Sequence, residues 1–234
     1  MMKIDPDGYK VAGITLLLDI IAYFVLYQTA FSLYVWITFG LLSVLIFSVS
    51  FFRDPVRRGP EDVNVVISAA DGVVKDVSEV GSEGFDGGKA LRIAVLMNVF
   101  NVHVNRTPVS GTVLNTRHQP GRKLSVYNDR AEYENEYGDT DLETPSGLVR
   151  IRQIAGLVAR RVVTRVKRGD SLERGDKIGL IRFGSRVDVF LPLIYEPVAV
   201  VGEKVHAGES VIAKLNAPSV QNPGGVNVEE NENN

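Results

Sequence analysis

Cysteine is absent from the 234-residue chain. Its absence excludes disulfide bonds, thiolate nucleophiles and cysteine-based zinc sites. Histidine is scarce, because His103, His118 and His206 are the only three, and no two of them have the spacing of metal ligands on one helix. The formal net charge is −2, so composition gives no reason to expect nucleic-acid binding. We therefore expect no metal site and no nucleic-acid partner.

Long apolar runs, by contrast, are present at the N-terminus, at residues 11–27 and 33–52. About 20 helical residues cross a hydrocarbon layer of ~30 Å. The second run meets that length. The first is shorter and carries Asp19, so it is either a true span or an interfacial or re-entrant segment. A cleaved signal peptide is the competing interpretation, but two tandem runs and the lack of an A-x-A-like site argue against it.

Positive charges flank this pair of runs. Lys3 and Lys10 precede the first run, and Arg53, Arg57 and Arg58 follow the second. Because positive flanks stay on the cytoplasmic side, both ends should be inside the cell. We predict that residues 1–58 form a hairpin anchor in the cell membrane, with the remaining domain on its cytoplasmic face. The hairpin could be an anchor alone, or it could also position the domain over a lipid substrate.

Residues 59–215 have the texture of a β domain. Short β-branched runs punctuated by glycine predict strands. Residues 169–179 and 202–212 share one pattern of glycine, acidic and apolar positions, which resembles the paired units of barrel-sandwich carriers. The fold class predicted is therefore mainly β (α+β), an N-terminal helical hairpin followed by a compact antiparallel β domain. We expect a short helix within 125–137, an acidic loop over 138–147, strand within 150–166 and a disordered tail at 216–234.

Three residues suggest a nucleophile, a base and a group that orients the base. Ser185 follows Gly184 at the mouth of an alternating segment, 186–191, that predicts a half-buried strand. His103 shares a strand face with Asn101 and Asn105, and Asp71 precedes Gly72 in a tight turn. Each has an ordinary structural explanation: a turn, a hydrogen-bonded surface histidine and a hairpin turn. Their separation in sequence is compatible with a catalytic set, because only spatial geometry matters.

An ordered series of motifs gives these residues a common meaning. The motifs are Arg-Asp-Pro at 53–55, Ser-Ala-Ala-Asp-Gly at 68–72, Asn-Val-His-Val-Asn-Arg-Thr-Pro at 101–108, Arg-Gln-Ile-Ala-Gly at 152–156 and Phe-Gly-Ser-Arg-Val-Asp at 183–188. Together they resemble the short prokaryotic phosphatidylserine decarboxylases, including archaeal relatives that act on archaetidylserine. The likeness covers nearly the whole chain from the hairpin to about residue 215.

The resemblance implies a self-cleaving precursor of a pyruvoyl-dependent decarboxylase. His103, oriented by Asp71, would take the Ser185 hydroxyl proton, and the Gly184–Ser185 bond would be cleaved. Chains 1–184 and 185–234 would remain together as a heterodimer, with further dimerisation possible. The pyruvoyl group derived from Ser185 would form a Schiff base with the amine of a serine phospholipid. His103 would also return a proton after CO₂ is lost.

Some positions depart from the family pattern or leave alternatives open. Asn-Glu-Tyr stands at 135–137 where relatives often have Asn-Glu-Arg, which puts that arginine's role in doubt. His118 and Arg122 lie in a segment similar to the substrate-side loop, and they could equally be solvated loop residues. The lipid could be phosphatidylserine or its archaeal ether equivalent.

Two other functions compete with this one. A membrane-anchored barrel-sandwich carrier or adaptor without catalysis would suit the hairpin and the repeated units. A carrier, however, would need a Met-Lys-Met hairpin tip and an adaptor would need heptads, and the sequence has neither. A pyruvoyl decarboxylase of soluble amino acids is the second, and the hairpin argues against it.

Overall fold

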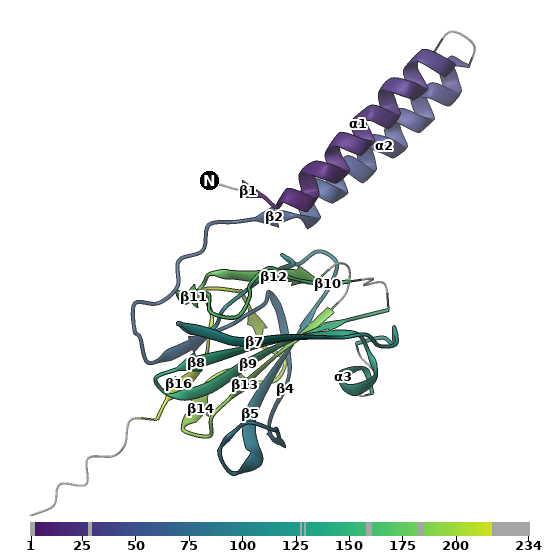
Figure 1. The fold of residues 1–234 in the computed structure, drawn as a ribbon. Helices are drawn as coiled ribbons and strands as arrows, with labels where there is room; N and C mark the ends of the chain where they lie inside the picture. Colours follow the sequence, from purple (N-terminus) through teal and green to yellow (C-terminus); the bar gives the residue numbers. More distant parts are fainter. Residues whose placement is uncertain are drawn as a thin grey trace, which may run out of the picture.

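A computed structural model describes residues 3–27, 30–126, 128, 130–157, 161–181 and 185–216. An antiparallel pair of long helices projects from a β domain (Figure 1). The predicted fold class is confirmed: two apolar N-terminal helices precede a mostly antiparallel β domain whose large sheet curls into a half-barrel. The predicted tail lies outside the described residues, except for Asn216.

The helical hairpin consists of α1 (Pro6–Leu26) and α2 (Phe31–Phe51). Asp5 caps α1 by accepting the Asp7 N–H at 3.1 Å, and proline occupies the first helical position, where no N–H is needed. Asp19 accepts a hydrogen bond from the Thr38 hydroxyl on α2 at 2.8 Å, so the polar group inside the first run has a partner on the second. Both helices are long and apolar enough to cross a membrane.

The β domain contains an eight-stranded sheet and two three-stranded sheets, and every strand pair in them is antiparallel. The large sheet has the order β11 (Ser171–Leu172), β7 (Gly111–Gln119), β8 (Tyr137–Thr144), β9 (Gly147–Ala155), β13 (Ser185–Leu191), β5 (Lys89–Met97), β4 (Gly72–Gly81) and β15 (Lys204–Val205). The small sheets are β10 (Val162–Thr164), β12 (Lys177–Ile181) and β6 (Val104–Arg106), and β14 (Tyr195–Pro197), β16 (Val211–Leu215) and β3 (Val65–Ile67). The remaining elements are the pair β1 (Lys3–Ile4) and β2 (Arg53–Asp54), helix α3 (Ala131–Glu134) and the 3₁₀ turn Asp86–Gly88.

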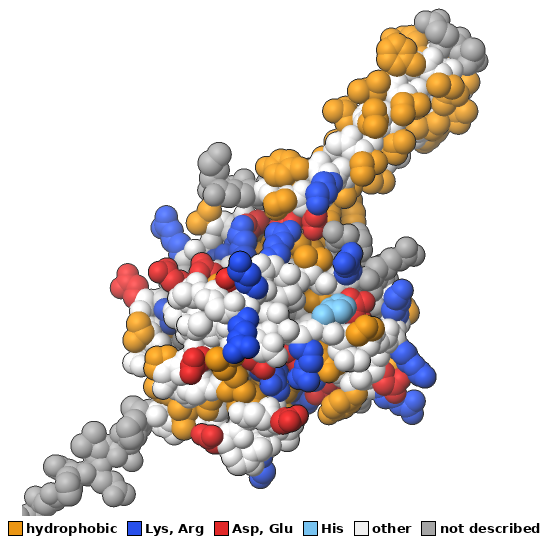
Figure 2. All heavy atoms as spheres, in the orientation of Figure 1, with side chains coloured by type: hydrophobic (Ala, Val, Ile, Leu, Met, Phe, Trp, Pro, Cys, Tyr) orange, Lys and Arg blue, Asp and Glu red, His pale blue; other side chains and the backbone are white. Residues whose placement is uncertain are grey.

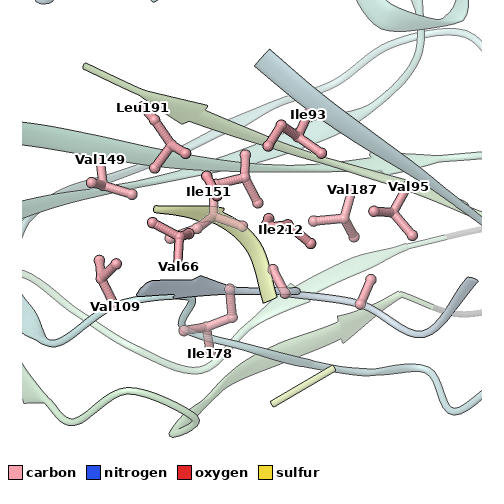
Figure 3. Close-up of a cluster of buried hydrophobic side chains, with 14 of the residues drawn as sticks. Val66, Ile93, Val95, Val109, Val149, Ile151, Ile178, Val187, Leu191 and Ile212 are labelled. Carbon is pink, nitrogen blue, oxygen red and sulfur yellow. The ribbon is translucent and has the colours of Figure 1, made fainter. Parts of the chain in front are cut away.

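The hydrophobic core lies between the large sheet and the two small sheets. Val187 and Leu191 of β13 project into it from the large sheet, and Ile178 and Ile212 come from the small sheets (Figure 3). All four side chains are fully buried. The alternation of β13 predicted from sequence therefore places its valines and leucine in the core.

The two similar segments form equivalent strand–turn units. Residues 169–179 contain β11 and the start of β12, and residues 202–212 contain β15 and the start of β16. Glycine occupies the left-handed region at matching places, with φ of +89° and +94° at Gly169 and Gly175 and +92° and +80° at Gly202 and Gly208. Only glycine adopts these angles without strain, so the shared glycine spacing reflects shared turn geometry.

Two local predictions, for segment 138–147 and for strand β13, were wrong, and side chains on the outer face of the large sheet explain why. The acidic segment 138–147 is mostly strand β8, not a loop, because Asp139 and Asp141 form ion pairs with Arg152 and Arg150 on β9. Strand β13 is buried on both faces, not on one. Its polar side is covered because Arg186 pairs with Asp188 at 2.6 Å and with Glu132 of α3 at 3.1 Å.

The strand predicted within 150–166 is confirmed, and the helix predicted within 125–137 is confirmed in part. Segment 150–166 does contain strand, as β9 and β10. The helix predicted within 125–137 is only the four residues of α3.

The hairpin is fastened to the β domain at its base. Arg165 makes two hydrogen bonds to the Asp5 carboxylate, at 2.6 and 2.7 Å. Asp54 pairs with Arg106 and Lys177. Figure 2 shows basic and acidic side chains gathered on the domain beneath the apolar hairpin. A small apolar cluster formed by Phe51, Phe52 and Leu180, with Ile4, Val11 and Val163 against it, fills the junction.

Truncation of a core side chain tests this architecture. Ile151 on β9 is 0% exposed within the core. Ile151→Ala removes buried methyl groups and leaves a cavity, so we expect the free energy of unfolding to fall by about 3 kcal/mol. Urea unfolding in detergent, followed by circular dichroism, measures the loss. Val198→Ala is the control, because Val198 is half exposed. Equal losses in the two variants would contradict the assignment of Ile151 to the core.

Candidate active site

Ser185 begins β13 and is completely buried. The strand register places it opposite Met97 of β5 on one side and Ala155 of β9 on the other. Its hydroxyl donates to the Met97 sulfur at 3.2 Å. A thioether is a weak acceptor, so the hydroxyl proton is held loosely. Gly184, the other half of the predicted cleavage site, lies outside the described residues.

His103 lies just before β6 and is 2% exposed. Its Nδ1 is 2.9 Å from the backbone carbonyl oxygen of Asn101. A carbonyl oxygen can only accept, so Nδ1 carries the proton and Nε2 has the free lone pair of a neutral imidazole. Nε2 is buried and has no hydrogen-bond partner among the described residues. This nitrogen can therefore accept a proton.

The surroundings of His103 keep its ring neutral. The pKa of His103 is lowered from 6.5 to about 4, because burial and then the positive charge of Arg53 outweigh the Asn101 carbonyl and the charge of Asp71, which raise it. At neutral pH the imidazole is consequently unprotonated. A neutral imidazole is the form that a general base requires.

The ring of Phe51 lies against the imidazole. The two ring centroids are 4.0 Å apart, with an angle of 28° between the planes. Phe51 is the last residue of α2 and is 1% exposed. One face of His103 is thus covered by the base of the helical hairpin.

Asp71 is buried in the turn between β3 and β4, but its described hydrogen bonds do not include His103. Both of its oxygens accept from Arg57 Nη2, at 3.0 and 2.8 Å, and Oδ1 also accepts the Ala207 N–H at 2.8 Å. His206 Nδ1 lies 3.6 Å away. Asp71 acts on His103 through its charge. Orientation of His103 by Asp71 therefore stays a prediction.

A buried polar chain connects the His103 segment with Ser185. Asn105 Nδ2 lies 3.7 Å from the Met97 sulfur that also receives the Ser185 hydroxyl. Gln153 Nε2 donates to Asn105 Oδ1 at 2.8 Å, and Thr164 contacts Gln153 at 3.4 Å. Within the described part of the chain, no direct hydrogen bond joins Ser185 to His103. Met97 and Asn105 therefore link Ser185 to β6, the strand that follows His103.

The two predicted substrate-side residues lie at the end of β7 and in the segment that follows. His118 is half exposed and sits 3.6 Å from the Glu136 carboxylate. Arg122 is exposed and pairs with Glu134 at 3.1 Å. Neither has a described contact with Ser185 or His103, and their role stays a prediction.

Asn135 does tie the nearby segment to the site. Its side-chain N–H group donates to the carbonyls of Leu124 and Ala155, both at 2.8 Å. Ala155 is the β9 partner of Ser185. The loop that follows Arg122 is therefore anchored beside the serine.

Sequence reasoning did not find several residues of this site. Phe51 looked like part of an apolar run, and Arg57 looked like a topology-setting flank charge. Met97 gave no chemical signal. Asn105 and Gln153 lie within the motifs at 101–108 and 152–156 but received no role there, although alternation did place Asn105 on the face of His103. No group of three or more metal-ligating side chains occurs in the described ranges.

An arginine-lined cavity includes none of Ser185, His103 and Asp71 in its lining. It has a volume of about 360 Å³ and lies on the outer face of the large sheet, lined by Arg117, Arg150 and Arg152 among others. Each of these arginines pairs with Asp139 or Asp141. The cavity therefore belongs to the ion-pair ladder of that face.

The described site thus holds a buried serine hydroxyl and a buried, neutral imidazole, in a β domain that carries an apolar hairpin. The family model for phosphatidylserine decarboxylase matches residues 44–213. A phosphatidylserine decarboxylase proenzyme of Oleidesulfovibrio alaskensis is 44% identical over 212 residues, 90% of this chain and 94% of that protein. A protein of the same description from Pelobacter propionicus is 47% identical over 76% of this chain and 80% of that protein. Another, from Erythrobacter litoralis, is 39% identical over 91% of this chain and 88% of that protein. The chain belongs to the phosphatidylserine decarboxylase family, and it is a decarboxylase.

The buried neutral state of His103 predicts a pH dependence of stability. Because the folded-state pKa is about 4 and the unfolded value is near 6.5, the unfolded chain binds more protons between these values. Stability should therefore fall as pH drops from 7 to 4, by about 3 kcal/mol for this group. Urea unfolding at each pH compares the Ser185→Ala protein with the Ser185→Ala, His103→Gln double variant and measures the difference in their free energies of unfolding. Ser185→Ala is present in both so that each remains one chain.

Comparing the two proteins cancels the effect of Asp188, which changes stability with pH in the opposite direction to His103. Burial raises the pKa of Asp188 to about 6, so Asp188 favours the folded state as pH falls. Asp188 is present in both proteins and cancels. If the two proteins have the same pH dependence, His103 is not buried in neutral form.

Proposed function

We propose that this chain is a proenzyme that cleaves itself between Gly184 and Ser185 and then decarboxylates phosphatidylserine to phosphatidylethanolamine. The observation that carries the proposal is a buried Ser185 hydroxyl that Met97 and Asn105 link to β6, the strand that follows His103. The unprotonated Nε2 of His103 has no hydrogen-bond partner among the described residues. The relatives, which are described as phosphatidylserine decarboxylase proenzymes, support both the precursor state and the lipid substrate.

Self-cleavage begins with the serine hydroxyl. His103 Nε2 accepts its proton, and Oγ attacks the Gly184 carbonyl carbon as the peptide C–N bond breaks and the nitrogen takes a proton. The amide becomes an ester. Removal of the Cα proton of residue 185 then expels the Gly184 carboxylate and leaves dehydroalanine. Addition of water and loss of ammonia convert that residue into a pyruvoyl group.

The residues around Ser185 fit such a group, because the site is buried and His103 Nε2 has no hydrogen-bond partner in the part of the chain that the structure describes. The pyruvoyl ketone supplies an electron sink for the carboxylate's bonding pair once the substrate amine has condensed with it. His103 holds and returns a proton at the carbon that loses CO₂. Asp71, fixed by Arg57 and the Ala207 N–H, offsets part of the positive charge that the imidazole gains.

The two cleaved chains would stay together as a heterodimer. The chain that begins at residue 185 would contribute β13, which pairs with β5 and β9 of the other chain, and β16, which pairs with β3. Both strands contribute to the core through residues such as Val187 and Ile212. Separating the chains would expose this apolar surface, which is unfavourable.

The site would work at the cytoplasmic face of the cell membrane. The hairpin is long and apolar enough to span, and basic residues flank it at both ends. Phe51 at its base touches His103, which supports a headgroup substrate held at the membrane surface. A carrier or adaptor without catalysis is not favoured, because the relatives are decarboxylases.

Removing the nucleophile tests self-cleavage. Wild type should resolve into chains of residues 1–184 and 185–234, the second beginning with a pyruvoyl group, whereas Ser185→Ala should remain one chain because it lacks a nucleophile. Denaturing electrophoresis and mass spectrometry measure this. Ser171→Ala is the control, because Ser171 is an exposed serine on β11 and the variant should cleave normally. An unbroken wild-type chain with serine at position 185 would falsify the proposal.

The substrate is tested separately. Purified protein in detergent–lipid micelles should release labelled CO₂ from phosphatidylserine carrying the label in its serine carboxyl group. Borohydride added during turnover should attach lipid to the chain that starts at residue 185. Free serine should compete poorly, because it lacks the lipid that places the headgroup at the site. Equal turnover of free serine would instead indicate a soluble amino-acid decarboxylase.

A further inference from the structure

We propose that the base of the hairpin is part of the catalytic site, with Phe51 as a positioning residue that fixes the plane of the His103 ring. Catalysis then depends on how the hairpin sits on the β domain and not only on its anchoring the domain to a membrane. This inference rests on the proposed function, since it assigns a role within the same site.

The contact between the two rings is close and shielded from water. Their centroids are 4.0 Å apart at an interplanar angle of 28°, and Phe51 and His103 are 1% and 2% exposed. The described hydrogen bonds of the imidazole are limited to the one between Nδ1 and the Asn101 carbonyl. A single hydrogen bond leaves the ring free to rock about that bond. The phenyl face restricts this motion and leaves Nε2 available.

Two polar contacts hold the same pair of segments together on either side of the ring contact. Arg53, two residues after Phe51, donates from Nη2 to the Phe100 carbonyl at 2.6 Å. Arg106, three residues after His103, donates from Nη2 to the Asp54 carboxylate at 2.5 Å. Residues 51–54 therefore contact the segment 100–106 at Phe100, at His103 and at Arg106. A hairpin that served only as a membrane anchor would not need three contacts with the segment that carries the base.

The hairpin is also held to the β domain through its first helix, α1. Asp5, the N-cap of α1, is bound by Arg165, which directly follows β10. Phe51 packs with Phe52 and Leu180, and Leu180 pairs with Val104, the neighbour of His103. A tilt of the hairpin on the domain would thus be transmitted to the His103 ring.

The ring contact also controls the environment of the base. The charged groups that act on His103 are Arg53 of β2, which disfavours its protonation, and Asp71 of the β3–β4 turn, which favours it. Phe51 covers one face of the ring with apolar surface. Loss of that cover admits water, so the pKa of His103 should rise from about 4 toward its usual value near 6.5.

The test compares Phe51→Leu with Phe51→Tyr and Phe39→Leu in the full chain. Leucine keeps apolar bulk but has no flat face, tyrosine keeps the ring, and Phe39 is an exposed residue of the same helix away from the site. We measure the rate of self-cleavage against pH and, for the mature enzyme, kcat and KM on vesicles of phosphatidylserine and phosphatidylcholine. Phe51→Leu should lower both the cleavage rate and kcat by about tenfold or more with little change in KM. Its acid limb should move up by about one pH unit.

The controls separate this inference from the proposed function. Phe51→Tyr should restore most of the rate, and Phe39→Leu should match wild type. If Phe51→Leu also matches wild type in rate and pH profile, the positioning role is wrong while the decarboxylase assignment stands. If wild type neither cleaves nor turns over lipid, the proposed function itself fails. Should Phe51→Leu not fold, judged by circular dichroism, Phe51→Met is measured against the same outcomes.

Discussion

The position of β13 between β5 and β9 is the constraint on which the site depends. One side of the strand fills the core with Val187, Val189 and Leu191, and the other side carries Arg186 and Asp188 in a buried ion pair. Charges in such a place are tolerated only when paired, because desolvation is costly. Both faces therefore fix the strand in register, and Ser185 at its first position can occupy only one place in the molecule.

A second constraint is the burial of a neutral imidazole at the junction with the hairpin. Burying a histidine without a charged partner favours the form that can accept a proton. The apolar cover comes from a residue of the long helix, and the polar contacts come from the loop and strand around the ring. The segment that carries His103 and the base of the hairpin thus pack together as one unit. This arrangement gives a physical reason why a lipid-metabolising site would be built at this end of the β domain.

Much of the fold was predictable because it follows from local patterns. The apolar runs indicated two helices, the alternation over 186–191 indicated a strand, and the glycine spacing of 169–179 and 202–212 indicated two equivalent turns. The acidic segment 138–147 was wrongly predicted as loop because its pairing partners, Arg150 and Arg152, are on another strand. At the site, residue types and motif order singled out Ser185, His103 and Asp71. The partner of Asp71 was not predictable, because Arg57 is equally plausible as a flank charge.

The sequence by itself determined the candidate site residues, the helical hairpin and the β character of the domain, because residue type, hydropathy and periodicity are properties of neighbouring positions. Only the tertiary structure decided which groups meet. It placed Phe51 on His103, Arg57 on Asp71 and Met97 under the Ser185 hydroxyl. These contacts join positions up to 88 residues apart, and the register of paired strands and the packing of the hairpin base set them, neither of which is encoded in any local pattern.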